Sequence, residues 1–192
     1  GFDISISSAT KYFSGHSDAM GGTLSVNKKT YNKIKLCDKL LGNRLSADEA
    51  YLIIRGLRTL DIRLKAHYEN TCKVINFLIK QKKIKEVLYP HKPGSKNYKM
   101  WKKYYSSGTG LLSIVIKAKN KSSVIRFVNK LDLFGIGYSW GGFESLAIYQ
   151  DISKSRNFYK FAKDEHLVRV HVGLEDPQDL INDLKNSLKY IK

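Results

Sequence analysis

Lys11 has neighbours that suit a phosphate site or an aldehyde site. It follows an alternating segment, residues 3–7, that predicts a short strand, and Ser8 and Thr10 stand just before it. A turn rich in small residues, 15–22, comes next. Hydroxyls and backbone N–H groups at such a turn can hold a phosphate, and a neutral lysine amine can condense with an aldehyde. A lysine after a strand is more often solvated, so these residues alone give only a candidate site.

Arg169 lies in a segment, 167–172, that alternates strictly and predicts a strand. Its valines fall on one face, and Arg169 and His171 fall on the other. A planar guanidinium matches a carboxylate with two charge-assisted hydrogen bonds. The pattern therefore indicates a carboxylate site, with a surface salt bridge as the alternative.

The segment 135–146 combines four glycines with Trp140. Glycines let a backbone approach a ligand closely, and a tryptophan ring offers a broad apolar wall. A tryptophan buried in an ordinary loop is the plainer interpretation of the same pattern.

Taken together, three stretches resemble the Cys/Met-metabolism pyridoxal-phosphate enzymes. They are Ser8-Ala9-Thr10-Lys11-Tyr12 with its glycine-rich turn, Gly135 to Leu146 with Ser139-Trp140-Gly141-Gly142, and Leu167 to Asp176. The resemblance spans nearly the whole chain. It implies pyridoxal 5'-phosphate (PLP) as the cofactor, carried covalently on Lys11 as the catalytic residue, with Ser8 and Thr10 contacting the phosphate.

The same resemblance implies a substrate site for a small sulfur amino acid. Arg169 and Ser139 would bind its α-carboxylate, and Trp140 would line the site. The Ser-Trp-Gly-Gly variant is similar to the bacterial cystathionine β-lyase branch of the family. That branch is a carbon–sulfur lyase, which converts cystathionine to homocysteine, pyruvate and ammonia in methionine biosynthesis. A γ-synthase or γ-lyase relative, and a non-catalytic remnant, are the alternatives.

The implied fold is α/β: the C-terminal part of a fold-type I PLP-dependent transferase. Residues 1–57 would be a remnant of the large PLP-binding domain, and residues 58–192 a C-terminal α+β domain with its connecting helix and an antiparallel sheet. In the family, the portion before the lysine strand supplies groups that contact the cofactor ring. We therefore expect a truncated or split chain that is inactive alone, with a separate N-terminal half as a partner and a homotetramer as the family assembly.

Local patterns predict the elements that must position these residues. Ser46 and Glu49 form a capping box that starts a long, bent helical stretch through Ile79. The pattern then changes to α+β, with an apolar strand at 111–116 and a closing helix that begins at Asp176-Pro177.

Composition limits the other classes of function. The chain has 34 basic and 17 acidic residues, a net charge of +17, which could attract nucleic acid. Only seven of the basic residues are arginine, and the lysines are scattered and form no single stripe, so we expect no nucleic-acid partner. No apolar run approaches the roughly 18 residues needed to cross a bilayer, which predicts a soluble, cytoplasmic protein without membrane contact. The two cysteines have no ligand-like spacing, so no metal is expected.

Overall fold

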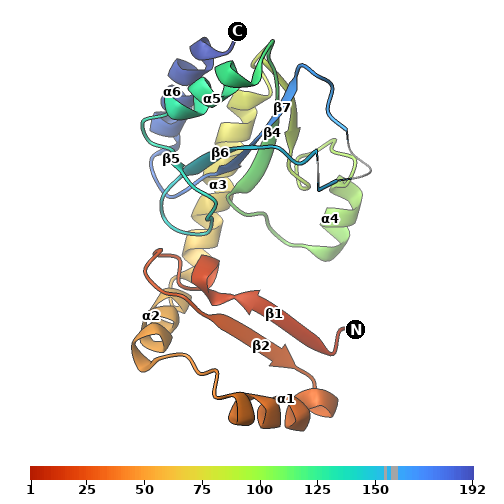
Figure 1. Ribbon diagram of the computed structural model, residues 1–192, viewed down its shortest axis with the longest axis vertical. Helices are drawn as coiled ribbons and strands as arrows, with labels where there is room; N and C mark the ends of the chain where they lie inside the picture. Colours follow the sequence, from red (N-terminus) through yellow and green to blue (C-terminus); the bar gives the residue numbers. More distant parts are fainter. Residues whose placement is uncertain (154, 157–159) are drawn as a thin grey trace. The chain divides into compact units, whose positions relative to one another are not determined.

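The computed structural model describes residues 1–153, 155–156 and 160–192, and the chain divides into two compact units (Figure 1). Unit 1 comprises Gly1–Asp61 and unit 2 comprises Ile62–Lys192. This division does not show which part holds a cofactor. The assignment of residues 1–57 to a PLP-binding domain therefore stays a prediction.

Unit 1 is built on an antiparallel hairpin. Its elements are β1 (Ile4–Ser8), the π-helical turn η1 (Ala9–Phe13), β2 (Gly22–Val26), α1 (Lys28–Leu41) and α2 (Ala47–Leu57). Ile4 lies opposite Val26 and Ser8 lies opposite Gly22, so the turn that carries Lys11 starts where the hairpin pairing stops.

The helix starts of unit 1 follow local capping rules. The Asn27 side chain accepts a hydrogen bond from the N–H of Thr30 at 3.0 Å, which begins α1. The Ser46 hydroxyl accepts one from the N–H of Glu49 at 3.2 Å, which confirms the predicted start of α2. Both caps satisfy backbone N–H groups that have no partner inside the helix.

Unit 2 is a five-stranded sheet with helices. Its elements are α3 (Leu60–Leu78), which begins just before the unit boundary, β3 (Ile84–Leu88), α4 (Tyr98–Tyr104), β4 (Leu111–Lys117), α5 (Lys121–Asn129), β5 (Gly135–Ile136), β6 (Leu146–Gln150), β7 (Glu165–His171), α6 (Pro177–Ser187) and η2 (Leu188–Tyr190). The strand order is β3-β4-β7-β6-β5, and all neighbours pair antiparallel except β5 with β6. The α/β fold class with an antiparallel C-terminal sheet is confirmed.

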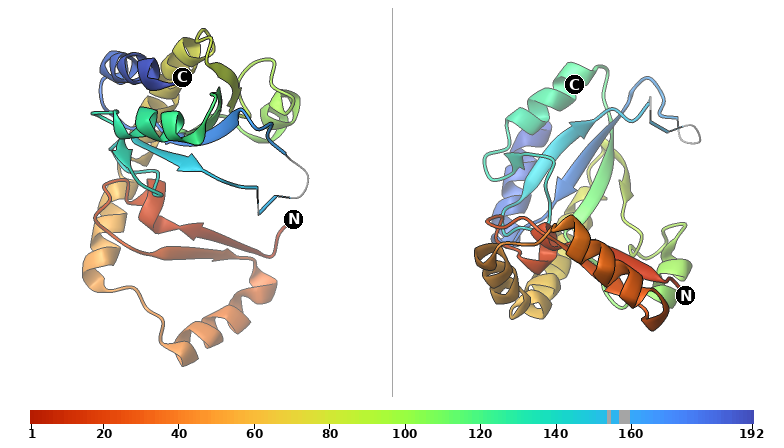
Figure 2. Two further views of the ribbon diagram at one scale, coloured as in Figure 1. Left: turned by 45° about the horizontal axis from the view of Figure 1, so that its top comes forward. Right: turned by 60° about the horizontal axis from the view of Figure 1, so that its bottom comes forward.

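One face of this sheet forms the core. Ile114 of β4 lies opposite Val168 of β7, and Ala147 of β6 lies opposite Val170. These residues share a buried cluster with apolar side chains of α3, α5 and α6, among them Phe127, which is completely buried. Figure 2 shows α5 and α6 side by side over the sheet.

Arg169 therefore points to the other face of the sheet, because it alternates with Val168 and Val170 along β7. Its cross-strand neighbours on that face are Ser113 of β4 and Ile148 of β6. The predicted alternation of this strand is thus confirmed, and it separates the packing residues from the candidate site residue.

Among the residues that the structure describes, no helix is both long and apolar enough to cross a bilayer. No group of three or more His, Cys, Asp or Glu side chains in the same ranges is placed to hold a metal ion.

Candidate active site

Lys11 lies inside the short turn η1, directly after β1. Its backbone leaves the helical region there, with φ −90° and ψ −124°. The N–H of Gly15 donates to the Lys11 carbonyl at 2.8 Å, and the N–H of Ser14 donates to the carbonyl of Ala9 at 3.0 Å. Backbone hydrogen bonds therefore fix the turn, and the half-buried Lys11 side chain leaves from a defined position.

Ser8 and Thr10 differ in what their hydroxyls do. The Thr10 hydroxyl accepts from the N–H of Gly21 at 2.9 Å and donates to the Gly21 carbonyl at 3.2 Å, so it ties the turn to the start of β2. The Ser8 hydroxyl has no hydrogen-bond partner among the described residues. Ser8 thus has a donor available for a phosphate, whereas the Thr10 proton is directed to Gly21. Both phosphate roles stay predictions.

Helix α2 supports the lysine turn through Gly56. A Cβ atom at this glycine would lie 2.2 Å from the Ser14 carbonyl oxygen and 2.5 Å from the Phe13 carbonyl oxygen. Such distances are far below van der Waals contact. Only glycine lets the α2 backbone pack this closely on the turn that follows Lys11.

Replacing Gly56 with alanine is therefore expected to destabilise unit 1. Alanine normally stabilises a helix by about 1 kcal/mol relative to glycine, but here overpacking costs about 1–3 kcal/mol, so the net change is a loss. Urea denaturation of the chain measures it, with Arg55→Ala as the control, since Arg55 is the exposed preceding residue of the same helix. A Gly56→Ala variant more stable than wild type would contradict the close packing.

In unit 2, Arg169 contacts the loop that precedes β6. One guanidinium nitrogen donates to the carbonyl oxygen of Tyr138, and also to that of Gly137 at 3.4 Å. The guanidinium carbon lies 5.7 Å from the centre of the Tyr138 ring. The structure thus brings Arg169 to Tyr138, the residue next to Ser139, although 31 positions separate Arg169 from Tyr138 in the sequence.

Ser139 and Trp140 follow directly in this loop. The Ser139 residue is exposed and Trp140 is half-buried, so the tryptophan is not an ordinary core residue. Gly141 follows with φ +84°, a left-handed conformation that side chains other than glycine rarely adopt. The roles of Ser139, Trp140 and Arg169 in substrate binding stay predictions.

A carboxylate network holds the end of this loop. Glu175 accepts from the N–H of Ser145 at 2.6 Å and from its hydroxyl at 2.8 Å. The same hydroxyl accepts from the N–H of Gly173 at 2.8 Å. These bonds tie the start of β6 to the segment after β7, which gives the predicted motif Gly173-Leu174-Glu175 a structural role.

His171 is a site residue whose function the sequence did not reveal. It is 2% exposed, its Nε2 accepts from the N–H of Gly141 at 2.8 Å, and its Nδ1 lies 3.2 Å from the Glu144 carbonyl oxygen. Burial, the neighbouring His67 and Arg169 lower the pKa of His171 to about 4. Alternation in the strand pointed only to a polar face, and the partner loop lies far away in sequence.

The free energy of unfolding is expected to fall as the pH drops from 6.5, the ordinary histidine pKa, to about 4, the lowered pKa of two buried histidines. Burial also lowers the pKa of His91 to about 4. In the unfolded chain both histidines take up a proton near pH 6.5, so unfolded molecules bind more protons throughout this window. The stability that comes from keeping these two histidines neutral is therefore fully present above this pH window. It is lost as the pH drops through the window, at up to about 1.4 kcal/mol per pH unit for each histidine.

Urea titrations across this pH window test that expectation. His91→Phe should remove about one proton from the pH dependence of the unfolding free energy. Equal slopes for the variant and the wild type would contradict the lowered pKa of His91.

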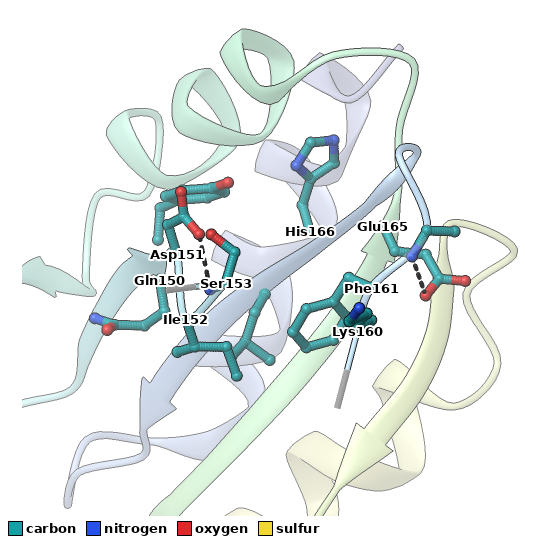
Figure 3. Close-up of a pocket in the computed structure, with 11 residues that line it drawn as sticks. Gln150, Asp151, Ile152, Ser153, Lys160, Phe161, Glu165 and His166 are labelled. Atoms are coloured by element: carbon teal, nitrogen blue, oxygen red, sulfur yellow. Dashed lines mark hydrogen bonds between the residues drawn. The ribbon is translucent and has the colours of Figure 1, made fainter. Parts of the chain in front are cut away.

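A separate pocket of about 460 Å³ lies where β6 ends and β7 begins (Figure 3). Gln150, Glu165 and His166 line it, together with residues from 151–153 and 160–162. None of the predicted site residues lines this pocket, and it takes no part in the candidate site.

Comparison with known proteins assigns the fold to a class. A crystal structure of cystathionine γ-synthase from Xanthomonas oryzae pv. oryzae superimposes with a TM-score of 0.87 at 26% identity, covering 99% of this chain and 50% of that one. The fold is that of the PLP-dependent enzymes acting on sulfur amino acids. The sequence profile of the Cys/Met metabolism PLP-dependent enzymes matches residues 1–189, and the chain belongs to this family.

Two curated relatives show the breadth of the family. Cystathionine beta-lyase MetC of Escherichia coli (strain K12) is 40% identical over 96% of this chain and 48% of its own length. The L-alanine/L-glutamate racemase of Wolbachia pipientis wMel is 35% identical over 98% of this chain and 47% of its own length. The chain thus spans about half the length of these relatives.

The residues present fit the PLP that this family uses. Unit 1 offers a half-buried lysine on a fixed turn and, at Ser8, a hydroxyl with no partner among the described residues. An amine suits the cofactor aldehyde, and a hydroxyl suits its phosphate. Gly21 and Gly22 end this turn and add no side chain at its last two positions.

Proposed function

We propose that this chain supplies the cofactor lysine and the substrate-carboxylate groups of a PLP-dependent carbon–sulfur lyase of the cystathionine β-lyase type. Its reaction would convert cystathionine and one water molecule to homocysteine, pyruvate and ammonia. The observation that carries the proposal is the contact of Arg169 with the loop that bears Ser139 and Trp140. Sequence identity of 40% with a cystathionine beta-lyase supports it.

Each residue has a defined task in this proposal. Bound PLP supplies an electron sink for the charge that develops at the substrate α-carbon. Lys11 would hold the cofactor through Nζ, and the same nitrogen would take the α-proton and pass a proton to the departing sulfur. Arg169 and Ser139 orient the substrate by its carboxylate, and Trp140 excludes water from one side.

The proposal includes a partner. Unit 1 has a groove of about 1170 Å³ whose lining includes large apolar side chains, and among them Ile6 is 77% exposed and Leu24 is 54% exposed. Exposed apolar surface of this kind marks an interaction site. We assign it to contact with the rest of the large PLP-binding domain, with residues 1–57 as the part of that domain in this sequence.

Product analysis tests the proposed reaction. The chain would be co-expressed with the part of the E. coli enzyme outside the match, purified with PLP, and given L-cystathionine. Pyruvate is the expected product. 2-Oxobutyrate would instead indicate γ-chemistry like that of the γ-synthases and γ-lyases, and turnover of L-alanine to D-alanine without pyruvate would indicate a racemase. Stable assembly without any turnover would favour a non-catalytic remnant.

A further inference from the structure

His171 bridges two points of the loop that carries Ser139 and Trp140. Its Nε2 accepts from the N–H of Gly141 at 2.8 Å, and its Nδ1 lies 3.2 Å from the carbonyl oxygen of Glu144. A backbone N–H can only donate and a carbonyl can only accept. The two contacts therefore require a neutral imidazole with its proton on Nδ1.

The surroundings of His171 keep it in this state. The side chain is almost completely buried, and His67 of α3 lies with its ring centre 5.2 Å away. Nδ1 of His67 in turn donates to the carbonyl of Val172 at 2.8 Å, so the two rings pack on the end of β7 together. Burial is the main cause that lowers the pKa of His171. The neighbouring His67 and the positive charge of Arg169 on the same strand lower it further. An imidazolium would donate from both nitrogens and would lose the bond from Gly141.

The backbone at Gly110 packs closely against the His171 ring. A Cβ atom at Gly110 would lie 3.0 Å from Nε2 of His171 and 2.4 Å from the carbonyl oxygen of Val172. The N–H of Val172 donates to the Gly110 carbonyl at 2.8 Å, which holds this backbone against the ring. The ring is thus confined between the start of β4 and the loop.

We propose that His171 is a positioning residue for the substrate-carboxylate site. It would act by holding the loop backbone that carries Ser139 and Trp140 in one position relative to β7. The inference rests on the proposed function of those residues and of Arg169. Arg169 anchors the loop at Tyr138, before the pair, and His171 anchors it at Gly141, after the pair. A two-residue segment fixed on both sides loses little further freedom when a substrate binds.

Three variants separate this role from simple filling of the core. His171→Phe keeps a planar ring without the acceptor, whereas His171→Gln places an amide oxygen where Nε2 accepts. His166→Phe is the matched control, because His166 is another buried histidine of β7 and lines the pocket at the other end of the strand. The wild-type chain itself provides a further test through the tautomer of His171.

The first measurement is made on the chain as it stands. Long-range ¹H–¹⁵N NMR should show the Nδ1–H tautomer of His171 at neutral pH. Hydrogen exchange at the Gly141 amide should accelerate on the order of tenfold in His171→Phe, as loss of one buried hydrogen bond predicts, and much less in His171→Gln and His166→Phe. An Nε2–H tautomer, or unchanged Gly141 exchange in a folded His171→Phe, would overturn the inference. Should His171→Phe fail to fold, the tautomer and the glutamine variant still decide it.

The second measurement separates the inference from the proposed function. With Trp101 replaced by phenylalanine, Trp140 is the single tryptophan, and its fluorescence reports the addition of L-cystathionine. We expect His171→Phe to weaken binding about tenfold and His171→Gln to restore most of it. Faster Gly141 exchange in His171→Phe, without any response of the wild type to cystathionine, would keep the positioning role and count against the proposed function. Binding that is weaker in Arg169→Lys but unchanged in His171→Phe would support the proposed function and overturn the positioning role of His171.

Discussion

Lys11→Ala is expected to lower pyruvate formation from L-cystathionine by at least about a thousandfold in the complemented enzyme. The substitution removes both the covalent attachment point of the cofactor and the base for the α-proton. The turn itself should survive, because the N–H of Gly15 donates to the backbone carbonyl of Lys11, which alanine retains. The measurement is pyruvate release by the chain co-expressed with the complementary part of a β-lyase.

Lys28→Ala is the matched control for this loss. Lys28 is an exposed lysine at the first position of α1, so its removal changes the net charge equally and should leave activity unchanged. Activity of Lys11→Ala within a few-fold of the control would contradict the assignment of the cofactor lysine.

Arg169→Lys is expected to raise the KM for cystathionine on the order of a hundredfold, with a smaller change in kcat. Lysine keeps the positive charge but lacks the planar fork that pairs with both carboxylate oxygens. It also loses the hydrogen bond from the guanidinium to Tyr138, which helps to hold the loop. Steady-state kinetics of the complemented enzyme separates the two constants.

Arg126→Ala provides the comparison, because Arg126 is an exposed arginine of α5. Its kinetics should match those of the wild type. An Arg169→Lys enzyme that keeps the wild-type KM would show that the guanidinium does not bind the substrate carboxylate.

Elements specified by neighbouring residues were predictable from the sequence. The N-cap at Ser46, the cap and proline at Asp176-Pro177 and the alternation in β7 all depend on residues a few positions apart, and each is confirmed. The family assignment was also predictable, because the motifs around Lys11 and Trp140 are short and continuous.

Features that depend on residues distant in sequence were not predictable. The strand β6 begins where the glycine-rich stretch 135–146 ends, and its place between β5 and β7 comes from pairing across the sheet. The hydrogen bonds between the Thr10 hydroxyl and Gly21 join residues 11 positions apart, and no local pattern indicated them. Likewise, the bond between His171 and Gly141 joins residues 30 positions apart, and no local pattern marks it.

The central claim is that the amine of Lys11 forms the covalent link to PLP. The most direct test incubates the complemented protein with PLP, reduces the link with borohydride, and maps the modified peptide by mass spectrometry. We predict a single saturable modification on Lys11, in the peptide that carries Ser8 and Thr10, and none at this position in Lys11→Ala. Modification distributed over exposed lysines such as Lys28, with Lys11 unmodified, would contradict the account.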